Sequence, residues 1–283
     1  MKITVTKEIF EENFGDNMYG AILGDIIGQP YEDDLHTETK DFPLFTENPE
    51  FTDDTVMTIA ICDGILSAGL NSDEAKMKKA IIESMHKWGN DYLAAGYGGT
   101  FYHWLIAKSY EPYNSFGNGS AMRVSSIGWF FETLERTREV ARWSAEVTHN
   151  HPEGIKGAES IASVIWLCRK GKSKDEIKTF IQNEFGYDLS RTCNQIRSEY
   201  TFDVSCQGTV PEAISAFLEG CDFEDVIRTA VSLGGDSDTL TCIAGSMAEA
   251  FYGVPQNLKQ KCLELTTSQM HDVIKNFEFF CKH

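Results

Sequence analysis

The segment from Gly234 to Thr239 constrains this chain most, and it reads Gly-Gly-Asp-Ser-Asp-Thr. Apolar residues follow it directly at helical spacing: Leu240, Ile243, Ala244, Met247 and Phe251. The glycine pair permits a left-handed turn, and Ser237 or Asp238 is expected to cap the helix. A cap needs one side-chain oxygen, so the other carboxylate is available for a divalent cation. Taken alone, the segment is more typical of a capped helix with a solvated neighbour.

Helical periodicity recurs along most of the chain, and it predicts an all-α fold. Possible capping boxes pair Asn71 with Glu74 and Ser173 with Glu176. Helices are predicted over 14–27, 56–66, 71–88, 120–131, 135–147, 154–169, 173–185, 210–218, 223–233, 239–252 and 268–280. Only 200–204 has a weak strand pattern. Because no repeat, low-complexity tract or linker divides the chain, we expect a single domain over residues 1–283.

The composition of the chain limits the kinds of molecule that it is expected to bind. The net charge of −18 argues against binding to a nucleic-acid backbone or an anionic membrane. The eight cysteines form no C-x-x-C pair, and several lie inside apolar helical runs, as small buried side chains do. The chain shows neither a leader-like N-terminus nor an apolar stretch of membrane-spanning length. We therefore expect a reduced, cytoplasmic protein, and a monomer.

A second carboxylate segment resembles the first. Thr52-Asp53-Asp54-Thr55 directly precedes a run that is apolar on all sides, which predicts a buried helix. Burying two adjacent carboxylates is unfavourable unless they are paired or bind metal, and the helix dipole accounts for one of them at most. With Glu32 and the segment at 236–239, five carboxylates and threonine hydroxyls can hold two divalent ions. The absence of His and Cys ligands disfavours zinc. Coincident helix caps remain the alternative.

Two glycine-rich segments are candidates for binding a phosphate. Residues 96–100 read Gly-Tyr-Gly-Gly-Thr, and residues 114–123 read Asn-Ser-Phe-Gly-Asn-Gly-Ser-Ala-Met-Arg at the start of a predicted helix. Neither has dinucleotide-fold spacing or a P-loop lysine, so a structural turn is an equal alternative. Phe116 can stack on a base or pack in the core. His149 is expected to contact substrate rather than to ligate metal.

These motifs together resemble the ADP-ribosylglycohydrolases, the family of dinitrogenase-reductase-activating glycohydrolase and the ADP-ribosyl-acceptor hydrolases. The resemblance rests on Gly20-Ala-Ile-Leu-Gly-Asp25 with Tyr31-Glu32, 51–55, 117–123, Thr148-His149 and 234–239, which run in family order from about residue 18 to 253. It implies a single-domain orthogonal helical bundle with a binuclear Mg²⁺ or Mn²⁺ centre.

The resemblance also implies roles for individual residues. The metal ligands fall on Glu32, Thr52, Asp53, Asp54, Asp236, Asp238 and Thr239. Substrate-binding positions fall on Gly96, Tyr97, Gly98, Gly99, Ser115, Phe116, Gly117, Asn118, Gly119, Ser120 and His149. Of the carboxylates, those expected to take part in catalysis are Glu32, Asp53, Asp54 and Asp238. Glu32 is the candidate for an acid/base or gating role. Phe116 stands where family members contact adenine.

The implied activity is hydrolysis of the bond between ADP-ribose and an acceptor, either a protein side chain or a small molecule. Cleavage at the anomeric carbon passes through an oxocarbenium-like state, and divalent ions would orient the ribose and lower the pKa of a water. Some arginine-linkage members carry a carboxylate in the loop that matches 96–100, where this chain has none. The acceptor linkage is therefore open. The alternatives are a non-catalytic ADP-ribose-binding protein and a binuclear-metal phosphohydrolase that cleaves the diphosphate.

Overall fold

The computed structural model describes residues 17–32 and 37–282, and within them the fold is all-α, as predicted. The first residues of the predicted helix at 14–27 lie outside this range. The described helices are α2 (Tyr19–Gly28), the 3₁₀ helix η1 (Gln29–Tyr31), α3 (Asp53–Ala68), α4 (Glu74–Asp91), α5 (Gly99–Ile106), α6 (Gly119–Met122), α7 (Ile127–Phe130), α8 (Leu134–Glu146), α9 (Pro152–Arg169), α10 (Lys174–Phe185), α11 (Cys193–Glu199), α12 (Cys206–Glu219), α13 (Phe223–Val231), α14 (Ser237–Tyr252), α15 (Gln256–Leu265) and α16 (Ser268–Lys282).

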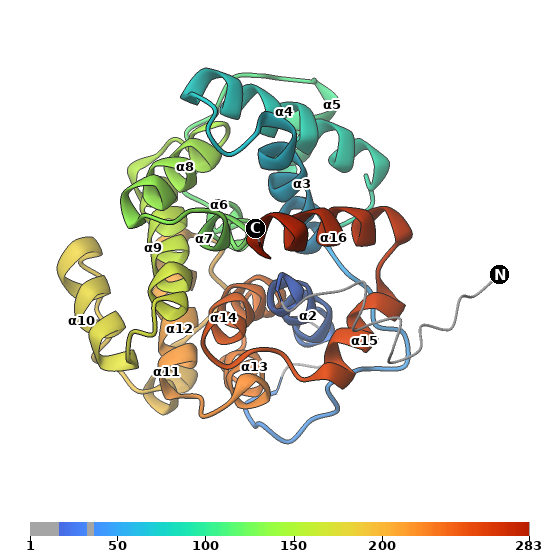
Figure 1. Ribbon diagram of the computed structural model, residues 1–283. Coiled ribbons are helices and arrows are strands. Elements are labelled where there is room, and N and C mark those ends of the chain that lie inside the picture. The colour runs from blue at the N-terminus through green and yellow to red at the C-terminus, as the bar shows by residue number, and fades with distance from the viewer. Residues whose placement is uncertain (1–16, 33–36, 283) are drawn as a thin grey trace.

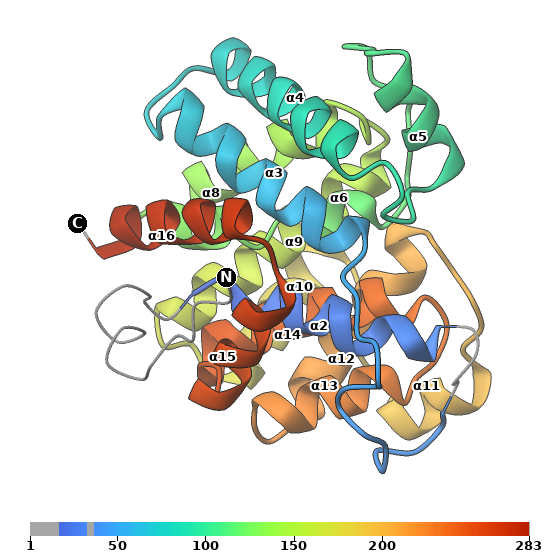
Figure 2. The same cartoon turned by 90° about the vertical axis from the view of Figure 1, so that its right-hand side faces the viewer.

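Helix α14 lies in the middle of the molecule, packed against α2, α9, α12 and α13 (Figure 1). Every residue from Ser237 to Glu249 is buried, which explains why this helix is apolar on more than one face. The pairs α3/α4 and α8/α9 pack beside this centre, and α16 crosses α3 (Figure 2). None of the helices in the described part of the chain combines the length and apolar character that crossing a membrane requires.

Glycines allow α2 and α14 to touch backbone to backbone. A Cβ at Gly20 would overlap the Gly245 carbonyl, one at Gly24 the Thr241 carbonyl, and one at Gly28 the Ser237 carbonyl. Because the partners descend in number as the glycines ascend, the two helices run antiparallel. The end of α2, followed by Glu32, therefore lies beside the start of α14.

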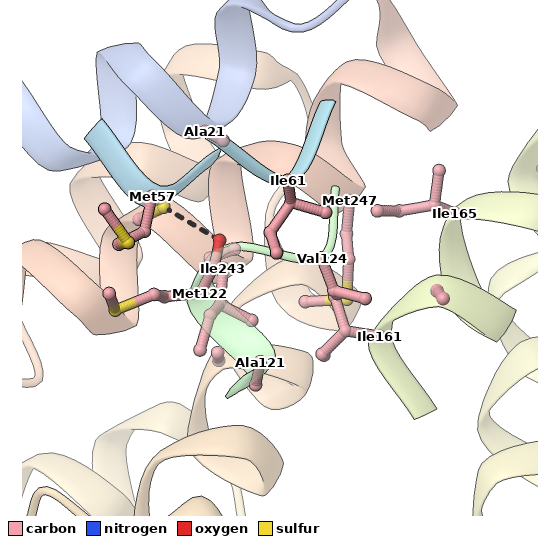
Figure 3. Close-up of a cluster of buried hydrophobic side chains, with 14 of the residues drawn as sticks. Ala21, Met57, Ile61, Ala121, Met122, Val124, Ile161, Ile165, Ile243 and Met247 are labelled. Atoms are coloured by element: carbon pink, nitrogen blue, oxygen red, sulfur yellow. Dashed lines mark hydrogen bonds between the residues drawn. The ribbon is translucent and has the colours of Figure 1, made fainter. Parts of the chain in front are cut away.

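The main apolar core forms between α3, α14, α9 and the short helix α6. Met57 and Ile61 from α3 face Met122 and Ile243, with Ile161 on the far side (Figure 3). Close packing in this core holds the first turns of α3 and α14 in position relative to each other. The two predicted carboxylate segments are the first turns of these two helices.

Several sequence predictions are wrong in detail. The cap of α4 is Asp73, whose side chain accepts from the Lys76 amide, and not Asn71. The predicted helix at 120–131 is two short helices, and 200–204 forms no strand, only an isolated bridge between Gly117 and Ser205 next to it. Helices α5, α11 and α15 were not predicted. The Ser173–Glu176 capping box is confirmed.

Candidate active site

The start of α3 presents two carboxylates to the interior. Thr52 is the N-cap, and its hydroxyl accepts from the Asp54 amide at 3.3 Å. Asp53 and Asp54 follow in the first turn. Asp54 is buried, and its Oδ1 has no hydrogen-bond partner within the described residues. An orphaned, buried carboxylate oxygen is unfavourable, and it fits a site whose missing partner is a cation.

Asp25, which the sequence reasoning gave no role, performs the capping at this helix start. Its side chain is fully buried in α2 and accepts from the amides of Thr52 and Thr55 at 2.9 and 3.0 Å. It also accepts from both threonine hydroxyls, with 2.7 Å between Thr52 Oγ1 and Asp25 Oδ1. Because Asp25 and Thr52 satisfy the first amides of α3, Asp53 and Asp54 are not needed as caps.

The start of α14 presents the matching pair. Gly234 and Gly235 both have positive φ, 76° and 72°, as the glycine pair predicted. The N-cap position falls on Asp236, without a side-chain capping bond, so the predicted N-cap position is wrong. Asp238 nevertheless accepts from a first-turn amide, that of Thr239, at 2.7 Å. The Asp236 side chain instead accepts from Asn118 Nδ2 at 2.6 Å. The Asp236 carboxylate therefore lies between Asn118 and the first turn of α14, where Asp238 is its neighbour.

The two helix starts meet directly. Thr239 Oγ1 donates to Asp54 Oδ2 at 3.1 Å, although the two residues are 185 positions apart. Three further carboxylate oxygens, one each from Glu32, Asp236 and Asp238, all lie within 4.8 Å of one another. Divalent ions such as Mg²⁺ and Ca²⁺ take carboxylate oxygens at about 2.0–2.6 Å, so oxygens at this spacing can share an ion. The donors are all hard oxygens, which favours Mg²⁺ or Mn²⁺ over zinc.

Burial, and after it the repulsion between like charges, raises the pKa values of these carboxylates. Burial raises the pKa of Asp54 well above its usual range, and the charges of Asp25 and Asp53 raise it further. Burial also raises the pKa of Asp238 well above its usual range, with added repulsion from Asp54 and Asp236. For Asp53, burial and the charge of Asp25 raise the pKa to about 8. Ionised carboxylates at this spacing need a positive counter-charge.

All seven predicted metal-binding residues line one cavity of about 630 Å³. This volume is typical of a small-molecule site. Eight of the predicted substrate-binding residues line the same cavity: Gly96, Gly98, Gly99, Ser115, Gly117, Asn118, Gly119 and His149. The glycine-rich segments and the carboxylates therefore share one space.

Three of the predicted substrate-binding residues are not among those that line this cavity. Tyr97 is buried, and its ring packs 5.4 Å from that of Phe101. Ser120 is buried and donates to the Gly154 carbonyl at 2.7 Å. Phe116 is 48% exposed, with its ring 5.4 Å from that of His151. Their roles toward a ligand stay predictions, and Phe116 has a face available outside the cavity.

His149 lies at the glycine-rich end of the cavity. Its Nε2 would lie 3.1 Å from a Cβ on Gly119 and 3.4 Å from one on Gly117, so the ring packs closely against both glycines. Its Nδ1 is 2.8 Å from Thr148 Oγ1. Burial and the nearby charge of Arg123 hold the pKa of His149 well below its usual range, so the ring is neutral.

Comparison with known proteins supports the family that the sequence motifs resemble. A family model described as ADP-ribosylglycohydrolase matches residues 6–279. The chain belongs to the ADP-ribosylglycohydrolase family. It is accordingly a hydrolase, and the resemblance seen in its motifs is confirmed.

Curated relatives of this ADP-ribosylglycohydrolase match over most of their length. The ADP-ribosylhydrolase ARH3 of Homo sapiens is 28% identical over 318 residues, covering 86% of this chain and 87% of the relative. The ADP-ribosylarginine hydrolase Tri1 of Pseudomonas putida (strain GB-1) is 25% identical over 284 residues, covering 89% and 73%. A solved structure titled ADP-ribosylglycohydrolase-related protein complex shares the fold, with a TM-score of 0.64, 23% identity, and coverage of 93% of this chain and 98% of that chain.

Some residues of the ADP-ribosylglycohydrolase site were missed from sequence. The motifs contain Asp25 and Arg123 but predicted no role for them. Tyr113, Phe202 and Val204 line the cavity, although the sequence predicted no part in a site for any of the three. Asp25 carried a readable signal, because a lone carboxylate inside an apolar, glycine-interrupted helix must find buried partners. Phe202 and Val204 carried no such signal. Their loop is held at the cavity by the single bridge between Gly117 and Ser205, with backbone hydrogen bonds from Asn118 N to Val204 O and from Cys206 N to Phe116 O.

Proposed function

We propose that this enzyme removes ADP-ribose from a modified acceptor by hydrolysing the glycosidic bond at the anomeric carbon of the ribose. The proposal rests chiefly on the orphaned Oδ1 of Asp54, which lies among carboxylates that face glycine-rich loops across one cavity. A sugar with hydroxyls next to a diphosphate is a ligand that needs both halves of such a cavity. The activities for which ARH3 and Tri1 are named support the same substrate class.

The carboxylates would hold two divalent ions, Mg²⁺ or Mn²⁺. Asp53, Asp54 and Thr52 would ligate from α3, and Asp236, Asp238 and Thr239 from α14, with Glu32 at the end of η1. When bound, these ions would supply Lewis acidity beside the ribose, and this is the chemistry that an oxocarbenium-like cleavage requires. The protein's own residues would bind and orient the substrate and transfer protons.

The protein's own residues bind and orient the sugar nucleotide. The loops at 96–99 and 115–119 lie against the diphosphate, with His149 behind the second loop. Glu32 is half-buried at the edge of the cavity, so it can move a proton between the reacting oxygen and solvent or close over the site. Phe116, exposed beside His151, provides a stacking face for adenine.

The acceptor is tested by assay. Arginine- and serine-ADP-ribosylated proteins are incubated with the enzyme and Mg²⁺ or Mn²⁺, beside a chelated control, and the products are separated. Release of intact ADP-ribose that depends on metal supports glycohydrolysis and identifies the linkage. Release of AMP would instead assign a phosphohydrolase, and tight ADP-ribose binding without any turnover would assign a binding protein.

A further inference from the structure

Arg123 is a buried cation without an ion pair in the part of the chain that the structure describes. Its residue is 1% exposed and lines the cavity, and no carboxylate of the described residues lies within salt-bridge distance of it. One terminal nitrogen donates to the Ser144 carbonyl at 3.0 Å and to Thr148 Oγ1 at 2.8 Å, and Nε has no partner. Burying an unpaired guanidinium is unfavourable for stability, which points to a role in the site.

The hydrogen bonds around Thr148 assign the position of its hydroxyl proton. Arg123 is always a donor, so Thr148 Oγ1 must accept from it. The threonine proton then needs an acceptor of its own. Among the described residues, the acceptor in reach is Nδ1 of His149 at 2.8 Å. If Nδ1 carried a proton instead, the buried Thr148 hydroxyl would be left without an acceptor.

An Nδ1 that accepts leaves the proton of a neutral imidazole on Nε2. Nε2 has no partner among the described residues, and it lies against Gly117 and Gly119 at the cavity. The ring therefore turns a donor, and not an acceptor, toward the glycine-rich loop. A donor at this place fits an oxygen of a diphosphate or a ribose.

We propose that Arg123 is a positioning residue that acts through Thr148 to hold His149 as its Nε2–H tautomer, so that His149 donates a hydrogen bond to an oxygen of the ADP-ribosyl group. The donation to substrate rests on the proposed function. The tautomer itself does not, because it follows from hydrogen bonds within the protein.

The tautomer can be measured directly in the full-length protein. Long-range ¹H–¹⁵N correlation spectra of histidine-labelled protein distinguish protonated from unprotonated ring nitrogens, and a His149→Asn variant identifies the resonance among the seven histidines. In the wild type we expect Nε2 protonated and Nδ1 unprotonated at neutral pH. A protonated Nδ1 would overturn the proposal.

Variants at Thr148 test the connection to Arg123. Thr148→Val removes the hydroxyl, and we expect the Nδ1–H tautomer to appear and the Kd for ADP-ribose, measured by calorimetry with Mg²⁺, to weaken about tenfold, as for one lost hydrogen bond. Thr148→Ser restores the hydroxyl and should restore both readouts. Unchanged tautomer and affinity in Thr148→Val would contradict the proposal.

A matched control separates positioning from a general loss of stability. Thr137 lies on α8, the helix that precedes Thr148; it is fully buried, donates to the Thr133 carbonyl at 2.9 Å and is not among the residues that line the cavity. Thr137→Val should be destabilised without any change in the His149 spectrum or in the Kd. If it changed both as much as Thr148→Val does, the effect would be structural and the proposal wrong. Absent hydrolysis by the wild type would refute the proposed function and leave the tautomer measurement valid.

Discussion

Glu249 and Asp54 are both buried carboxylates beside the start of a helix, and they differ in what their oxygens contact. Glu249, on α14, accepts from the Tyr19 and Gly20 amides at 2.9 and 3.1 Å, and so caps α2 with both oxygens. Asp54 has one oxygen bonded to Thr239 and one without a partner in the described residues. The first arrangement is complete in the protein alone, whereas the second leaves one oxygen without a partner, which the proposed cation would supply.

These two residues show why the sequence alone does not distinguish a carboxylate that caps a helix from one that is available to bind a cation. Helix α3 is already capped by Asp25 and Thr52, so its own first-turn carboxylates are surplus to capping. Capping carboxylates should matter for stability, and surplus ones for metal binding and turnover. Five substitutions separate these roles.

The largest effect is expected for Asp54→Asn and Asp238→Asn. Each keeps the size and one acceptor oxygen but removes a negative charge, and we expect at least about a hundredfold loss of turnover with weaker metal binding. Without metal, each variant should be as stable as the wild type or more so, because like charges no longer face each other. Calorimetric titration of Mg²⁺ beside a hydrolysis assay measures both. Wild-type values in both variants would mean that these carboxylates are not ligands.

Asp25→Asn should combine the two effects. The amide nitrogen cannot accept, so at least one of the Thr52 and Thr55 donors loses its partner, with a loss of about 1–3 kcal/mol in the free energy of unfolding. Since Thr52 then loses its orientation, metal affinity should also fall by about 10- to 100-fold. Asp63→Asn is the control, because Asp63 accepts from Trp88 Nε1 at 2.8 Å outside the cavity. It should lose stability only.

Glu249→Gln should change how stability depends on pH. Burial raises the pKa of Glu249 from its usual value to about 7, so the folded state holds this proton more tightly than the unfolded state. Its contribution to stability is therefore present at pH below about 4.5 and is lost as the pH rises to about 7. Urea unfolding at pH about 5 to about 8 should show a flatter dependence in the variant. Identical slopes would assign Glu249 an ordinary pKa.

The smallest effect is expected for Glu135→Gln. Glu135 lies in the first turn of α8, exposed, where Thr133 already caps the helix. Its interaction with the helix dipole is screened, so stability should change by less than about 0.5 kcal/mol and turnover should not change. A large loss of rate at unchanged stability would place the site elsewhere and remove the basis of the comparison.

The sequence predicted the helices with strong apolar periodicity, such as α9 and α14, because burial of a face determines them. It did not predict α5. It also did not predict that the helix expected over 120–131 is interrupted at Arg123, whose side chain makes tertiary hydrogen bonds to Ser144 and Thr148. For the site, repeated carboxylate-threonine segments predicted which residues line the cavity. Asp25 was missed because its partners lie in another helix, and Phe202 because a loop without periodicity carries it.

The close contact between α2 and α14 also bears on when the site can form. Tyr19 and Glu249 are 230 positions apart, so nearly the whole chain must be synthesised before α2 meets the helix that pairs with it. Contacts this distant in sequence are slow to form, because a long loop must close first. A chain that stops before residue 236 lacks two of the five proposed carboxylate ligands, Asp236 and Asp238, and α2 is then left with an exposed glycine face. We expect divalent cations to bind only after α14 has been synthesised and has packed against α2, so that a bound ion marks a chain in which these two helices have paired.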